Sequence, residues 1–95
     1  MNDDGDEIST RTRNIMVDVL GLRLNPEDIT DDMSLYSPRI KLDSLSMLQL
    51  LLAVEGEFGV QLDDEDVMEA DLRNVGDLMQ LLRRIVREKS PEGSA

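Results

Sequence analysis

The sequence contains neither cysteine nor histidine. Without cysteine the chain has no disulfide, no zinc–thiolate site and no thiol nucleophile. Without histidine it has no Ser-His-Asp triad, no imidazole general base and no His-ligated metal site. Carboxylates, hydroxyls and a few amines are the only groups left for chemistry, so the sequence predicts no catalytic residue and no metal site.

Aromatic residues are also scarce, at 2% of the 95 residues, with one Tyr, one Phe and no Trp. Hydrophobic residues still account for 40% of the chain, which is enough for one core. A core of aliphatic residues and Met suits helices better than a β-sandwich. The length predicts a single domain over residues 1–95, and it argues against a large barrel or an enzyme with two lobes.

Basic residues are outnumbered, because 10 Lys and Arg face 21 Asp and Glu and leave a formal net charge of −11. Phosphates and anionic lipid surfaces would repel such a chain, whereas basic patches on proteins would attract it. The sequence has no run of 18 apolar residues, and its first residues are acidic, unlike a signal peptide. We therefore expect a cytoplasmic protein with no nucleic-acid partner and no membrane span.

Apolar residues recur at helical spacing in four segments, which predicts an all-α, four-helix bundle. The expected helices cover about residues 7–20, 44–58, 64–69 and 75–88, with polar ends at 1–6 and 89–95. The third helix is short, and a long loop joins the first two helices. Isolated apolar residues in this loop favour packing over disorder. Asn74 and Asp77 match a weak form of the capping box at the start of the last helix.

The expected second helix, residues 44–58, is the most apolar part of the chain. Most of the apolar surface of this helix must be buried, so the helix either lies at the centre of the fold or binds a partner. Asp43 and Ser44 are both good N-cap residues for it, and by position alone the Ser44 hydroxyl is the expected cap. An exposed hydroxyl at this place could also be an attachment point, because a phosphodiester is favoured at a helix N-terminus. The chain has no base to activate this hydroxyl, so any modification would need another enzyme.

The segment around Ser44 resembles the signature of acyl carrier proteins. The residues that carry the resemblance are Asp43-Ser44-Leu45 and the end of the apolar helix, Glu55-Gly56-Glu57-Phe58-Gly59-Val60. Further matches lie at Leu20-Gly21-Leu22, at Ile29-Thr30-Asp31-Asp32 with Ser34-Leu35, and at Leu62 with Asp64-Glu65. The resemblance covers most of the chain and leaves out only the two polar ends.

The resemblance implies that Ser44 receives a 4′-phosphopantetheine arm from coenzyme A through a phosphopantetheinyl transferase. The thiol of that arm holds acyl groups as thioesters, so a chain without cysteine can still carry reactive sulfur. The implied protein is a monomeric carrier and not an enzyme. Its partners would be the transferase and acyl-loading and acyl-processing enzymes with basic docking patches.

Partner enzymes of acyl carrier proteins recognise the second helix through acidic and apolar residues, and Asp43, Leu45 and Glu55 match these positions. Ser46 and Gln49 stand where acids are common, and Lys41 stands where Gly is usual. The start of the helix is therefore less acidic than in typical fatty-acid carriers. We expect partner enzymes to make apolar contacts at Leu45 and Met47. We also expect a dedicated pathway, such as polyketide or other specialised acyl assembly, with fatty-acid synthesis as the alternative pathway.

Two other interpretations remain open from the sequence. A peptidyl or aryl carrier of nonribosomal assembly would share the arm and differ only in cargo. An unmodified, acidic helical adaptor that binds basic proteins would have no arm at all.

Overall fold

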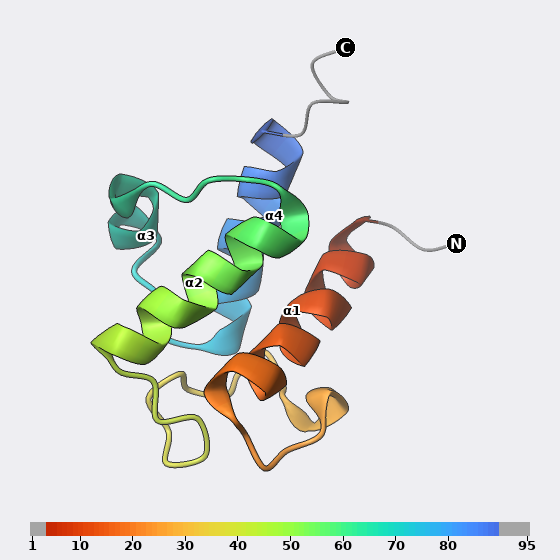
Figure 1. Ribbon diagram of the computed structural model, residues 1–95, viewed down its shortest axis with the longest axis vertical. Helices are drawn as coiled ribbons and strands as arrows, with labels where there is room; N and C mark the ends of the chain where they lie inside the picture. The colour runs from red at the N-terminus through yellow and green to blue at the C-terminus, as the bar shows by residue number, and fades with distance from the viewer. Residues whose placement is uncertain (1–3, 90–95) are drawn as a thin grey trace.

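The computed structural model describes residues 4–89, and its regular elements are helices (Figure 1). They are α1 (Asp4–Leu20), the 3-10 helix η1 (Pro26–Asp28), α2 (Ser44–Phe58), α3 (Asp64–Ala70) and α4 (Val75–Lys89). No strand forms within residues 4–89. The prediction of an all-α fold with a long first loop and a short third helix is confirmed.

The predicted ends of the helices differ from the observed ends mainly at α1. This helix begins at Asp4, so the expected polar end at 1–6 is wrong for residues 4–6. Acidic residues are favoured in a first helical turn by the helix dipole, which makes an acidic stretch compatible with a helix start. At the other end, α4 includes Lys89. The remaining parts of the expected polar ends, 1–3 and 90–95, lie outside the described residues.

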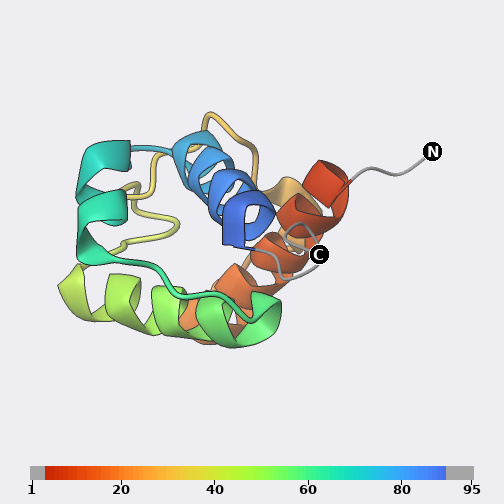
Figure 2. The same ribbon diagram turned by 90° about the horizontal axis from the view of Figure 1, so that it is seen from above.

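The core of the molecule is centred on α4. Figure 2 shows α4 between α3 and α1, and α2 runs along one side of these three helices. α1 packs against both α2 and α4, and α3 packs against α4. The side chains of α4 that are almost completely buried are Val75, Leu78, Met79, Leu81, Leu82 and Ile85. These apolar side chains of α4 therefore fill the core.

α2 is less buried than its composition suggests. Only Leu50 and Val54 of this helix are buried. Leu45, Leu48 and Leu52 are 64%, 54% and 58% exposed. Met47, Leu51 and Phe58 are partly buried against the core, so the chain covers one side of this helix. The exposed side supports the alternative that α2 binds a partner.

The long loop between α1 and α2 is packed, as the sequence predicts. Backbone hydrogen bonds fix it to the start of α4: Leu35 N donates to Arg73 O at 3.0 Å, and Val75 N donates to Met33 O at 2.9 Å. Gly76 N donates to Asp31 O at 2.7 Å. A Cβ at Gly76 would lie 3.2 Å from that oxygen, so the glycine permits the close approach.

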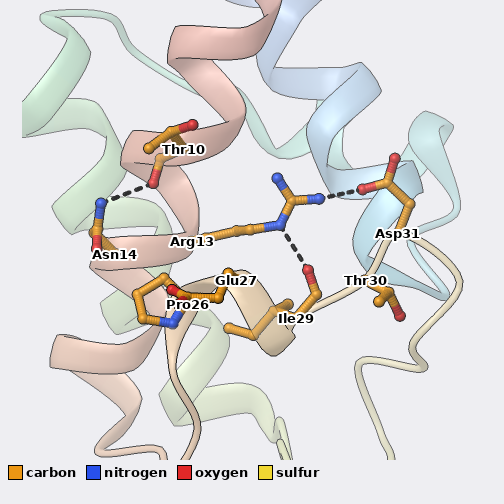
Figure 3. Close-up of a pocket in the computed structure, with 8 residues that line it drawn as sticks. All are labelled: Thr10, Arg13, Asn14, Pro26, Glu27, Ile29, Thr30 and Asp31. Carbon is orange, nitrogen blue, oxygen red and sulfur yellow. Dashed lines mark hydrogen bonds and ion pairs between the residues drawn. The ribbon is translucent and has the colours of Figure 1, made fainter.

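Arg13 on α1 holds the same loop from the other side (Figure 3). Its Nε donates to Ile29 O at 2.7 Å, and its Nη2 pairs with Asp31 Oδ1 at 2.5 Å. It also donates to the Ser9 hydroxyl. The loop that leads into α2 is thus fixed to α1 and to α4, and it holds the first residues of α2 in position.

The capping box predicted for the last helix is present. Asp77 N donates to Asn74 Oδ1 at 2.8 Å, and Asn74 N donates to Asp77 Oδ2 at 3.2 Å. Two backbone donors at the start of α4 are satisfied in this way.

Candidate functional site

Ser44 is the first residue of α2 and is exposed. The segment before it is anchored, because Leu42 is buried and its N–H donates to Leu35 O at 3.1 Å. Within residues 4–89 the Ser44 hydroxyl makes no hydrogen bond. The structure therefore presents this hydroxyl to solvent from a fixed backbone.

Asp43, and not Ser44, is the N-cap of α2. Its backbone is extended, and its Oδ1 accepts a hydrogen bond from Ser46 N at 2.8 Å. The expectation that the Ser44 hydroxyl caps the helix is wrong, because α2 begins at Ser44 itself, one residue earlier than that role requires. Because the Ser44 hydroxyl does not cap the helix, it is available for covalent attachment.

The capping contact lowers the pKa of Asp43 below its usual value. The main cause is the hydrogen bond from the Ser46 backbone N–H, followed by one from the Ser46 side chain. Both favour the carboxylate over the carboxylic acid. Asp43 is thus a charged cap beside Ser44 at neutral pH.

The lowered pKa of Asp43 makes part of the stability depend on pH. For a carboxyl whose pKa is lower in the folded state, the stabilisation is complete above the unfolded value, near 4. It is lost as pH falls through the lowered folded value. We expect Asp43→Ala to lower the melting temperature at pH 7. This gap in melting temperature between the variant and the parent protein should become smaller below about pH 4. Melting curves from pH 7 to pH 2 measure this gap, and a constant gap would contradict the assignment.

The predicted docking residues fall into two groups. Leu45 is exposed, as expected. Met47 is partly buried and packs against the core, so it offers less surface than Leu45, and its contact with a partner stays a prediction. It lies two residues after Leu45, which turns it to the other side of the helix. Glu55 is also partly buried, and its Oε2 accepts a hydrogen bond from Leu62 N at 2.7 Å. Its carboxylate therefore holds the connection from α2 to α3.

Sequence reasoning missed two residues of the exposed surface, Leu48 and Leu52. They follow Leu45 at spacings of three and seven residues, so all three lie on one side of α2. We call Leu45, Leu48 and Leu52 the leucine face. The spacing was present in the sequence, but a helix that is apolar all round does not reveal which side the core covers. No residue from Ser44 to Val54 is charged, so the leucine face lies on an uncharged stretch.

Acidic groups near the site come from α3 as well as from Asp43. The first turn of α3 contains Asp64, Glu65 and Asp66. Figures 1 and 2 both place α3 at the same end of the molecule as the start of α2. A partner that docks over Ser44 would therefore meet an apolar helix face with acidic groups beside it.

The residues at Ser44 fit the phosphodiester that joins a phosphopantetheine arm to a serine. The hydroxyl is exposed and unpaired among the described residues, and it starts a helix of 15 residues. The N-terminal end of a helix stabilises negative charge through its dipole.

Within residues 4–89, no helix is long and apolar enough to cross a bilayer. No group of three His, Cys, Asp or Glu residues in that range could hold a metal ion.

Comparison with known proteins gives an independent view of the same site. Residues 10–85 match the family model described as "Phosphopantetheine attachment site". The meromycolate extension acyl carrier protein of Mycolicibacterium smegmatis is 32% identical over 90 residues, which is 95% of this chain and 85% of that protein. Its counterpart in Mycolicibacterium aurum is 33% identical over 89 residues, 94% of this chain and 86% of the relative.

A third relative has a more general name. The acyl carrier protein of Rhodococcus erythropolis is 32% identical over 83 residues, which is 87% of this chain and 86% of that protein. The matches span nearly the full length of both partners, and the matched range includes Ser44 and α2. The chain therefore belongs to the acyl carrier protein family, whose cofactor is covalently attached 4′-phosphopantetheine.

Proposed function

We propose that Ser44 is the attachment point of the 4′-phosphopantetheine arm, and that the chain presents acyl groups to biosynthetic enzymes as thioesters on that arm. The observation that carries the proposal is the exposed, unpaired Ser44 hydroxyl at the start of α2. When bound, the arm supplies the thiol that the chain lacks. The helix start stabilises the negative charge of the linkage, and the packed loop fixes its position.

The chain acts in this proposal as a carrier and not as an enzyme. Among the side chains of residues 7–88 none forms a hydrogen bond with Ser44 Oγ, so no described group is placed to remove its proton. The phosphopantetheinyl transferase must therefore supply the base. A monomeric, cytoplasmic carrier is the form that we propose.

The names of the relatives favour one kind of pathway. Two of them are meromycolate extension acyl carrier proteins. By that likeness we propose the extension of fatty acyl chains as the pathway, ahead of polyketide or other specialised assembly. Nonribosomal carriage of amino or aryl acids would need the same arm, and loading assays with adenylating enzymes would reveal it.

The test of the proposed function is to incubate the protein with coenzyme A and a promiscuous phosphopantetheinyl transferase and then to measure the intact mass. We expect a gain of one arm. An unmodified adaptor would keep its mass, and that result would refute the proposal.

The leucine face is the surface that we propose for docking of the transferase and the other partner enzymes. Its three leucines are more than half exposed, and burying such a side chain stabilises a complex by about 1 kcal/mol. We propose a partner with an apolar groove for these leucines and basic groups that face the acids of α3.

Replacing Leu48 by Ser should lower kcat/KM for arm attachment by about fivefold, because roughly 1 kcal/mol of apolar contact is lost. The transferase assay at limiting carrier concentration measures this change. Gln80→Ser is the matched control, since Gln80 is also an exposed helical residue and lies on α4, outside the leucine face. Equal rates for the parent, Leu48→Ser and Gln80→Ser would rule out docking through this face.

A further inference from the structure

A basic pocket lies beside the start of α2. It is an open hollow of about 460 Å³ between the end of α1, the loop that follows it, the segment 38–41 and Ser46 of α2. Three of its lining residues are cations, namely Arg23, Arg39 and Lys41, and none is an acid. We call it the basic pocket.

The three cations are unpaired in a chain with a large excess of acid. The sequence has 21 acidic and 10 basic residues. Yet among the ion pairs of the described residues none includes Arg23, Arg39 or Lys41. The nearest acid along the chain to Arg39 and Lys41 is Asp43, whose carboxylate is engaged as the cap of α2. The pocket therefore concentrates positive charge that the protein does not neutralise.

A larger hollow of about 760 Å³ has no unpaired cation in its lining. It lies between α1 and η1 (Figure 3), and no residue of α2 lines it. Its one basic residue, Arg13, already bonds to Ile29 O and Asp31. That hollow offers no free positive group to a ligand.

The wall of the basic pocket is apolar between the cations. It includes Leu20, Leu22, Leu24 and Ile40. A hollow with apolar walls and a few charged groups fits an organic chain that bears an anionic group, since the chain contacts the walls and the anion contacts the cations. Arginine is well suited to bind phosphate or carboxylate oxygens.

The pocket lies within reach of anything attached to Ser44. Lys41 and Ser46, which both line it, lie three residues before and two residues after Ser44. Lys41 holds this place with a left-handed backbone, at a φ of 54°, which is unusual for a residue with a side chain. A flexible arm at Ser44 would start at the rim of the pocket.

We propose that the basic pocket binds an anionic group delivered by the arm at Ser44, either its phosphodiester or a carboxylate on the acyl cargo. This inference rests on the proposed attachment at Ser44. In the bound state the anion lies against Arg39 and Lys41, and the adjoining carbon chain contacts the leucines of the loop. The pocket would thus favour the docked arm over the extended arm until a partner enzyme takes the cargo.

The test compares four forms of the protein: without the arm, with the free arm, with a butyryl group and with a malonyl group. The transferase prepares the last three from coenzyme A, butyryl-CoA and malonyl-CoA, and the intact mass confirms each one. We expect the anion to raise the melting temperature by about 2–5 °C at low salt, as one exposed ion pair would. High salt should reduce the rise.

The pattern among the forms identifies the anion. A rise in all three forms that carry the arm assigns it to the phosphodiester, and a rise in the malonyl form alone assigns it to the cargo carboxylate. Arg39→Gln, and as a second variant Lys41→Gln, should remove the rise, while Arg87→Gln should keep it because Arg87 lies on α4, away from the pocket lining. Backbone amide shifts in the NMR spectrum should change at residues 39–41 in the same forms.

Two results would overturn the proposal. One is the absence of any rise in the three forms that carry the arm, and the other is the same rise in Arg39→Gln as in the parent protein. If the mass shows no arm at all, the proposed function itself has failed, and the pocket proposal fails with it. If the arm attaches and Arg39 has no influence, only the pocket proposal fails.

Discussion

Ser44→Ala should abolish phosphopantetheine attachment completely. The substitution removes one oxygen, the exposed hydroxyl at the start of α2, and leaves no acceptor for the arm. The fold should survive because the cap of this helix is the Asp43 carboxylate, which the change does not touch. Intact mass after incubation with coenzyme A and the transferase measures the loss, and a melting curve close to that of the parent protein shows that the fold remains.

Ser46→Ala is the matched control for this experiment. Ser46 is in the same helical turn but is half-buried, and it lines the basic pocket. Its variant should gain one arm like the parent protein. An arm on Ser44→Ala, or a loss of attachment in Ser46→Ala alone, would show that the site has been assigned to the wrong serine.

Leu35→Asp should destabilise the protein by about 3–5 kcal/mol, because an ionised carboxylate would replace a buried leucine. Leu35 is 0% exposed and belongs to the loop that supports α2. A domain of this size is stable by roughly 5–14 kcal/mol, so the loss is a large part of the total. Thermal or urea unfolding measures it, and we expect a fall in melting temperature of more than about 12 °C.

The neighbouring residue gives the control for this prediction. Tyr36 is 59% exposed, so Tyr36→Asp should change the stability by only about 0.5 kcal/mol. Both variants add one negative charge to the same loop, and the difference between them therefore isolates burial. Equal losses in the two variants would mean that charge, and not packing, decides the stability of the loop.

Local patterns in the sequence were enough to predict the helices and several of their ends. The last helix has polar residues on one side and apolar residues on the other, so its buried face could be predicted. The pair Asn74 and Asp77 forms its capping box through contacts three residues apart, which a sequence pattern can contain.

The burial of α2 depends on other parts of the fold and could not be read from its own sequence. This helix is apolar on all sides, so composition does not tell which leucines face α1 and which remain exposed. Only the structure shows that Leu50 is buried and that Leu48, two residues earlier, is 54% exposed.

The same limit applies at the candidate site. The importance of Ser44 could be inferred from its neighbours along the chain, but the identity of the cap depends on a backbone angle at Asp43. The role of Glu55 depends on a hydrogen bond with Leu62 N, seven residues away and beyond the end of the helix. The basic pocket joins residues 20–24 with residues 38–41, which only the folded chain brings together.

The most direct test of the account is peptide mapping by tandem mass spectrometry of the protein isolated from cells that make it and contain its transferase. We expect a 4′-phosphopantetheine arm on the peptide that contains Ser44, attached to the oxygen of that residue. A Ser44 hydroxyl that stays unmodified in such cells, or an arm found on a different serine, would contradict it.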